Sequence, residues 1–357
     1  MMRTITVSVG SADDAYADFF SAAQHNGWTD GLPVIPPTPE RVEALVSTID
    51  RDPESVVAVL PPRHGPATVR GIAANAVMAG CLPEYFPVVL AAVEAISDPA
   101  FPLATLVGMR PETPFLLING PVRQAIGLEC GRGCLGPGWR GNATIGRALR
   151  LIMINLGGLA PGTYARSCFA SPLQYTFCSG EDEENSPWEP FHVERGFAHD
   201  VSVVSVFRVT SYIALFAPLD WDQSPRGLLQ HTGLSMGSPG NTAMYAGSLS
   251  CLLLFNHERA RLLADAGISK AQAKAMLYEF SMMPVAGFRP GDLEVLREKG
   301  RVVDERVSLV DSPDDIHIVV MGGPGIHTVY LPGFAHEVIP HLPVSKCISH
   351  DNTGQAT

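Results

Sequence analysis

The segment LECGRGCLGPGWRGNATIGRALRLIMINLGG, residues Leu128–Gly158, joins a glycine-rich loop to a long helical pattern. Asn142 is a favourable N-cap, and the apolar residues after it recur at helical spacing as far as Gly157, a favourable terminating residue. We therefore predict a largely buried helix that begins near Asn142 and directly follows a glycine-rich turn.

The start of this predicted helix is also a candidate anion site. Free amides of a first helical turn and the positive end of the helix dipole attract a carboxylate or a phosphate. Glycine lets a ligand approach the backbone because it has no Cβ. The residues that this local pattern predicts to bind substrate are Gly136, Gly138 and Arg140.

A purely structural interpretation of the same segment stays open. The loop matches neither the GxxxxGK[ST] nor the GxGxxG pattern, so a nucleotide phosphate is not specifically indicated. In this alternative, the loop is a tight connection into a core helix, and Arg147 and Arg150 are paired with carboxylates.

The rest of the chain predicts an α/β fold of mixed or parallel sheets flanked by helices. TPFLLINGP at 113–121 is typical of a buried strand, and similar strands alternate with helical patterns further along. Glycine-rich GPG turns at 136–138 and 323–325 hint at two related α/β halves. We expect one unit over residues 1–175, an acidic loop over 176–200 and a second unit over 201–357.

Composition excludes some partners. The formal net charge of −11 leaves no basic surface for nucleic acid, and no apolar run is long enough to span a membrane. The seven cysteines are odd in number and scattered, unlike a secreted disulfide framework. We expect a cytoplasmic homo-oligomer without a membrane or nucleic-acid partner.

Cys130 and Cys134 are the candidate nucleophilic or redox residues. They form a C-x-x-x-C pair around Arg132, with a helix start downstream, and such a setting lowers a thiol pKa. The alternative is that both thiols only fill space beneath a loop. A metal site would need two further ligands, and neither Cys168 nor Cys178 has a partner at zinc-site spacing.

Two further segments carry candidate proton-transfer and binding groups. The acidic segment 177–194 contains His192 and Glu189, which together suit proton transfer, although acidic runs are usually solvated surfaces. The segment MGGPGIHTVYLPG at 321–333 combines a backbone nest with His327, a candidate substrate-binding residue. The alternative there is a hairpin turn whose histidine faces water.

Four segments also resemble a known bacterial family, the one associated with UGSC-type (Sec/Cys-Gly-Ser-Cys) selenoproteins and their cysteine forms. They are NAVMAGCLPEYFPVVLAAVEAI at 75–96, GPGWRGNATIGRALRLIMINLGG at 136–158, EENSPWEPFHVERGF at 183–197 and HIVVMGGPGIHTVYLPGF at 317–334. The resemblance runs from about Trp28 to His341 and implies thiol-based redox chemistry in the system, with a selenoprotein as a candidate partner. The resemblance also implies that Asn142, Thr144 and Arg147, in the core pattern GPGxRxNATIGRA, belong to the substrate-binding site together with Gly136, Gly138 and Arg140. This chain lacks the U/C-G-S-C motif itself.

Three functional hypotheses follow. In the first, the protein is an enzyme that acts on a small anionic organic substrate with a cysteine thiolate as nucleophile or redox group. In the second, it is a hydrolase or lyase that uses histidines and carboxylates, with or without a metal ion. In the third, it is a non-catalytic subunit that binds a ligand or a selenoprotein reductase partner. No cofactor is firmly indicated.

Overall fold

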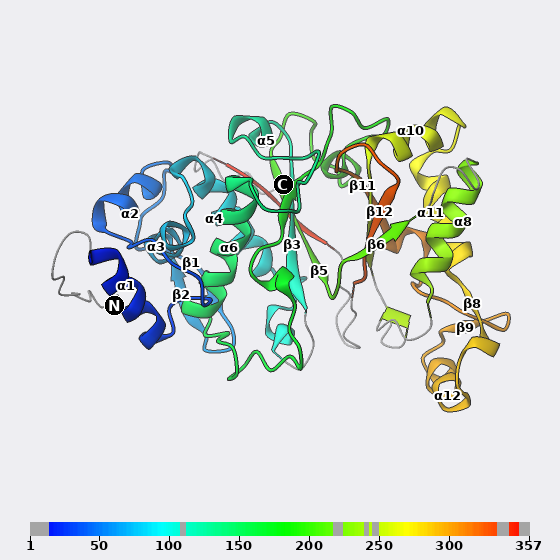
Figure 1. The fold of residues 1–357 in the computed structure, drawn as a ribbon, viewed down its shortest axis with the longest axis horizontal. Coiled ribbons are helices and arrows are strands. Elements are labelled where there is room, and N and C mark those ends of the chain that lie inside the picture. The colour runs from blue at the N-terminus through cyan, green and yellow to red at the C-terminus, as the bar shows by residue number, and fades with distance from the viewer. Residues whose placement is uncertain are drawn as a thin grey trace.

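Two mixed four-stranded sheets face each other, and helices cover their outer faces (Figure 1). The computed structural model describes residues 14–107, 112–216, 224–238, 243–244, 250–333 and 343–349. The fold is α/β with mixed sheets, as predicted from the alternation of strand and helix patterns.

The first sheet has the order β13-β5-β3-β4. Strand β3 is parallel to β4 and antiparallel to β5, which in turn pairs antiparallel with β13. The strands are β3 (Thr113–Asn119), β4 (Cys178–Gly180), β5 (Val203–Val209) and β13 (Val344–Cys347). Its outer face packs on α3 (Val69–Ala79), α4 (Phe86–Ile96) and α6 (Arg140–Asn155).

The second sheet has the order β11-β7-β12-β6. Strands β11 and β12 are consecutive in sequence but do not form a hairpin, because β7 lies between them. The strands are β6 (Ile213–Phe216), β7 (Cys251–Phe255), β11 (Ile316–Val320) and β12 (His327–Leu331). Its outer helices are α8 (Pro225–Met236), α10 (His257–Asp265) and α11 (Lys270–Ser281).

Side-chain alternation along the strands creates the layers. In β3, Leu116 and Ile118 join the core beneath the first helices, whereas Phe115 and Leu117 join a separate core between the sheets. In β7, Leu252 and Leu254 meet them in that central core. Successive strand residues point to opposite faces, so both faces of each sheet are buried.

The remaining elements surround these layers. Thr38 is the N-cap of α2 and precedes Pro39, and Ser269 forms a capping box with Gln272 of α11. These elements are α1 (Ala15–Asn26), α2 (Pro39–Val46), β1 (Val56–Leu60), β2 (Gly65–Thr68), α5 (Val122–Ala125), α7 (Phe191–Glu194), β8 (Met283–Pro284), α12 (Pro290–Glu298), β9 (Val302–Val303), β10 (Arg306–Val307), and the short helices η1 (Pro83–Tyr85), η2 (Leu103–Leu106), η3 (Pro172–Gln174), η4 (Val285–Gly287) and η5 (Pro313–Asp315).

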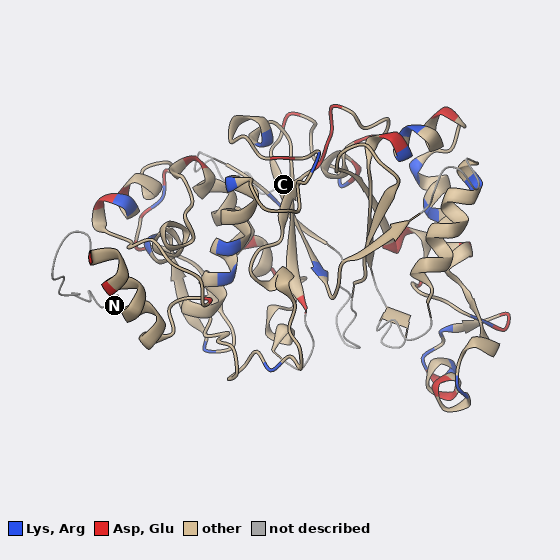
Figure 2. Cartoon of the chain, viewed as in Figure 1, with Lys and Arg blue, Asp and Glu red and all other residues tan. Residues whose placement is uncertain are grey.

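The chain crosses between the two sheets more than once. Strands β5 and β13 both follow residue 201 in sequence but lie in the sheet built around β3. Figure 2 shows charged residues mainly on the outer helices and loops, with the central strands almost free of them. No helix in the described ranges is both long and apolar enough to cross a bilayer.

Candidate functional site

A cavity of about 480 Å³ lies between the two glycine-rich loops, and we call it the loop cavity. One loop is residues 131–138, which lead into α6, and the other is residues 322–326, which connect β11 to β12. The cavity adjoins the carboxyl ends of β7 and β11, a common position for ligand sites in α/β folds. Its lining is mostly apolar and includes Leu135, Leu173, Phe177, Leu254, Met321 and Val329.

The two loops are joined directly. The N–H of Gly322 donates to the carbonyl oxygen of Cys130 at 2.8 Å. A Cβ on Gly323 would lie 2.8 Å from the Cβ and 2.9 Å from the Cα of Arg132, so only glycine fits this contact. The sequence predicted a nest at Gly322–Gly325, but it gave no sign that the nest would meet the first loop.

Asn142 fixes the first loop. Its side-chain amide donates to the carbonyl oxygens of Glu129 at 2.8 Å and Cys134 at 2.9 Å, and its Oδ1 accepts from the N–H of Glu129 at 3.0 Å. The predicted N-cap at Asn142 is therefore wrong. Helix α6 begins at Arg140, with Trp139 as N-cap and no capping side chain, because the Asn142 amide is used to hold the loop.

Cys134 is buried and is one of the residues that line the loop cavity, whereas Cys130 does not line it. Burial raises the pKa of Cys134, and hydrogen bonds from the Ser179 hydroxyl and the Gly322 N–H act in the opposite direction. Burial also raises the pKa of Cys130 to about 12, although Arg123 partly offsets this effect. The predicted lowering of both thiol pKa values is wrong, because desolvation outweighs the nearby positive charge.

His327 lines the same cavity and lies at the start of β12. Its side chain is exposed, and its ring centroid lies 5.6 Å from that of Phe216. Asn256 holds this loop, since its Nδ2 donates to the carbonyl of Gly325 at 2.8 Å while its Oδ1 caps α10 through Arg259 N–H. Sequence analysis missed both Asn256 and Tyr212, another lining residue; the strand-to-helix position of Asn256 was the available signal.

Some backbone amides of the lining residues lack a partner in the described structure. Within the described residues, the N–H groups of Leu135 and Gly323, one from each loop, have no hydrogen-bond partner. The N–H of Gly325 is occupied, because it donates to the carboxylate of Glu258 at 2.9 Å. Arg132 lies beside Gly323, is exposed, and forms no ion pair with any residue that the structure describes.

Most of the predicted anion-binding residues of α6 have other partners. Arg140 donates to the carbonyl of Gly80 at 3.0 and 3.1 Å, and Thr144 donates to the carbonyl of Arg140. Arg147 forms a two-fold ion pair with Asp30, at 2.8 and 2.9 Å. Neither these three residues nor Gly138 lines the loop cavity, whereas Gly136 does.

The acidic segment lies apart from this cavity. His192 is fully buried, with Nε2 3.4 Å from the carbonyl of His199 and Nδ1 3.9 Å from Glu183. Burial lowers the pKa of His192, against the opposing effect of Glu183. Glu189 accepts a hydrogen bond from Lys270 through its backbone carbonyl. Of the predicted site residues, the structure thus brings Cys134, Gly136 and His327 together and places the others elsewhere.

Neither a metal-binding group in the described residues nor a similar known protein identifies the reaction. Among the residues that the structure places, no group of three or more His, Cys, Asp and Glu side chains is arranged to hold a metal ion. Comparisons with protein-family models, curated proteins and solved structures find no match. The resemblance to the UGSC-associated family therefore stays a prediction.

Proposed function

We propose that the protein is an enzyme that binds a small anionic organic substrate in the loop cavity and uses the Cys134 thiol as its nucleophile or redox group. The observation that carries this proposal is the common lining: a thiol, an imidazole and two unpaired backbone amides share one largely apolar cavity. A cavity of this size, with few polar groups on apolar walls, is typical of a small-molecule site.

The lining groups have complementary roles in the proposal. Apolar residues such as Leu173 and Phe177 contact the body of the substrate, and the amides of Leu135 and Gly323 bind its negative charge. Arg132, beside Gly323, adds the nearest uncompensated positive charge. These features favour an anion over a neutral ligand of the same shape.

The raised pKa of Cys134 implies a thiol that is protonated at rest. In the nucleophilic form of the proposal, His327 accepts the thiol proton as the sulfur attacks an electrophilic carbon of the substrate. The electron pair displaced onto the substrate oxygen is then stabilised by the free amides.

The cellular compartment and the partners of the enzyme are part of the same proposal. All seven cysteines have free thiols, which fits a reducing compartment such as the cytoplasm. Homo-oligomerisation, and a selenoprotein partner implied by the family resemblance, also remain proposals. No observation of the structure specifically favours the metal-assisted or non-catalytic alternatives.

The proposal is tested by turnover of a panel of small carboxylates that carry a carbonyl, thioester or disulfide group. Cys134→Ser should abolish turnover of any substrate that the wild type converts and should leave its Kd within about threefold. Cys168→Ser is the matched control, because Cys168 is exposed and lies outside the cavity lining. Wild-type turnover by Cys134→Ser would remove the thiol from the mechanism.

A further inference from the structure

Arg150 is a buried cation without a counter-ion. It lies on α6, and 9% of its surface is accessible to solvent. Its side chain forms no hydrogen bond or ion pair with any residue in the described ranges. Burial lowers the pKa of this guanidinium, and the more distant Asp30 only partly offsets the effect. A guanidinium nevertheless stays protonated in proteins and carries five N–H donors, so an unpaired one is costly to bury.

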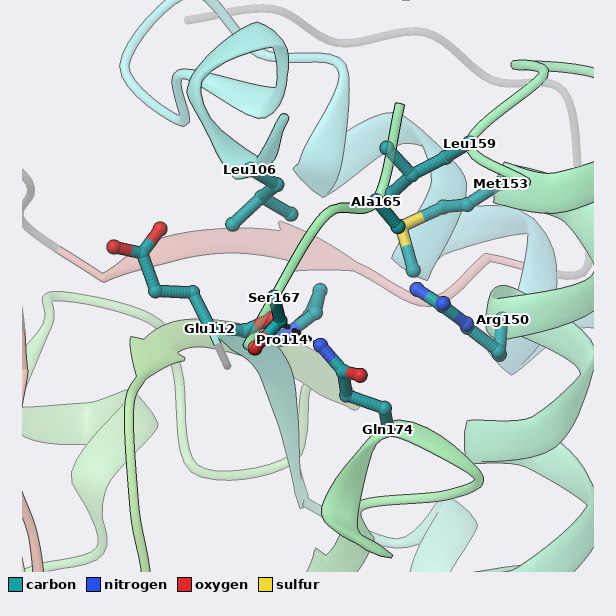
Figure 3. Close-up of a pocket in the computed structure, with 9 residues that line it drawn as sticks. All are labelled: Leu106, Glu112, Pro114, Arg150, Met153, Leu159, Ala165, Ser167 and Gln174. Atoms are coloured by element: carbon teal, nitrogen blue, oxygen red, sulfur yellow. Dashed lines mark hydrogen bonds between the residues drawn. The ribbon is translucent and has the colours of Figure 1, made fainter. Parts of the chain in front are cut away.

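The neighbouring carboxylates are already used. Asp30 accepts two hydrogen bonds from Arg147, and Glu112 is paired with Arg208. Figure 3, which draws the smaller of the two cavities that Arg150 lines, shows its side chain extending between Met153 and Gln174, while the Glu112 carboxylate points away from it. Among the described residues, no carboxylate is therefore left to balance the charge of Arg150.

Arg150 lines a cavity of about 370 Å³, which we call the Arg150 cavity, and a smaller one of about 10 Å³ that shares Ala165, Ser167 and Gln174 with it. The polar groups around it include two hydroxyls as well as Asp30 and Gln174. The hydroxyl oxygens of Ser167 and Ser171 already accept backbone N–H groups, so their hydrogens are free to point toward a ligand.

We infer that the Arg150 cavity is a second ligand site, which binds the carboxylate group of a small organic acid. A planar carboxylate matches the guanidinium fork, and its single charge balances that of Arg150. A phosphate dianion would leave an excess negative charge beside Asp30, because Arg147 is already neutralised by Asp30. Within the described lining, Arg150 is the sole cation.

The site is separate from the loop cavity but adjoins it through η3. Leu173 of this short helix lines the loop cavity, and the next residue, Gln174, lines the Arg150 cavity. A carboxylate on Arg150 would therefore lie next to the segment that forms one wall of the other cavity. The inference stands independently of the chemistry proposed for Cys134.

The test is a titration of the full-length protein with 4-fluorobenzoate, followed by ¹⁹F NMR. Arg150→Met should weaken the Arg150-dependent binding component at least about tenfold, because a charge-assisted pair is lost. Arg150→Lys should retain part of it. Gly323→Ala, which alters only the loop cavity, should leave this component unchanged and so separates the two sites.

A second measurement compares ligand-induced changes in melting temperature, which remain interpretable if Arg150→Met alters the stability of the ligand-free protein. In the Gly323→Ala background, which removes ligand binding in the loop cavity, acetate and benzoate should raise the melting temperature at constant ionic strength. Adding Arg150→Met, or Ala165→Leu to fill the Arg150 cavity, should abolish this rise. Equal binding by wild type and Arg150→Met would overturn the inference. Tighter Arg150-dependent binding of inorganic phosphate than of every carboxylate would overturn the assigned ligand class.

Discussion

The backbone N–H of Gly322 donates a 2.8 Å hydrogen bond to the carbonyl oxygen of Cys130. This bond ties the loop before α6 to the loop between β11 and β12, and so sets Cys134 and His327 on one cavity. The candidate site thus depends on a contact between the two sheets rather than on either loop alone.

Gly323→Ala should separate the two loops. The added Cβ would lie 2.9 Å from the Cα of Arg132, and backbone cannot yield as a flexible side chain does. We expect loss of ligand binding in the loop cavity with a folded protein, measured by calorimetric titration and circular dichroism. Gly291→Ala is the control, because its Cβ meets nothing within 4 Å and should leave binding unchanged.

His327→Gln should lower kcat by about 10²–10⁴-fold, the usual contribution of a general acid or base. The substrate Kd and the melting temperature should stay close to wild type, because the side chain is exposed. His231→Gln, on exposed α8 surface, provides the control in steady-state kinetics. An unchanged kcat in His327→Gln would exclude His327 from proton transfer.

The features that could be predicted from the sequence depend on residues close together in the chain. Thr38 before Pro39 defines a helix start locally, and β3 is recognisable as a fully buried apolar run. Asn142 has the same local preference for an N-cap position as Thr38. Its side-chain amide instead donates hydrogen bonds to the carbonyl oxygens of Glu129 and Cys134. Local preference cannot reveal such competition, because it depends on which loop the folded chain brings alongside.

The partners of charged side chains could not be predicted from the sequence either. Arg147 and Arg150 lie one turn apart on α6, and both were candidates for pairing with carboxylates. Only Arg147 meets one, Asp30, from a segment far away in the chain. The pairing of β13 with β5 is likewise non-local, so the membership of the first sheet could not be predicted from strand patterns.

Arg147→Met should destabilise the fold by about 1.5–3 kcal/mol, because it leaves the buried Asp30 without its charge-assisted partner. Affinity in the loop cavity should not change, since Arg147 does not line it. Urea unfolding of Arg147→Met, Asp30→Asn and the double variant measures their coupling. Full additivity, or a specific loss of substrate binding, would contradict the assigned structural role.

Glu181→Gln should stabilise the protein at neutral pH. Burial raises the pKa of Glu181, with Lys270 the leading opposing influence, and its Oε1 is buried without a hydrogen-bond partner in the described structure. A raised carboxyl pKa favours the native state fully below the unfolded value, near 4.5, and that stability is lost as pH rises through the folded value. The advantage of Glu181→Gln in urea unfolding should therefore grow from pH 4 to pH 8.

Glu184→Gln is the control of opposite sign. The hydrogen bond from Arg123 lowers the pKa of Glu184, so this carboxylate stabilises the native state above its unfolded pKa and loses that effect as pH falls. Glu184→Gln should destabilise at pH 7 and converge with wild type in acid. Parallel stability profiles for both variants would contradict the different environments of the two carboxylates.

The most direct test of the loop cavity as an anion site is the alkylation of Cys134 by iodoacetate and by its neutral counterpart iodoacetamide, resolved by peptide mass spectrometry at pH 9. If the cavity binds anions beside this thiol, the iodoacetate-to-iodoacetamide rate ratio at Cys134 should exceed that at exposed Cys168 by about tenfold, the equivalent of one charge-assisted hydrogen bond. Gly323→Ala should abolish the excess. Equal ratios at the two thiols, or an unreacted Cys134 when Cys168 is fully labelled, would contradict the account.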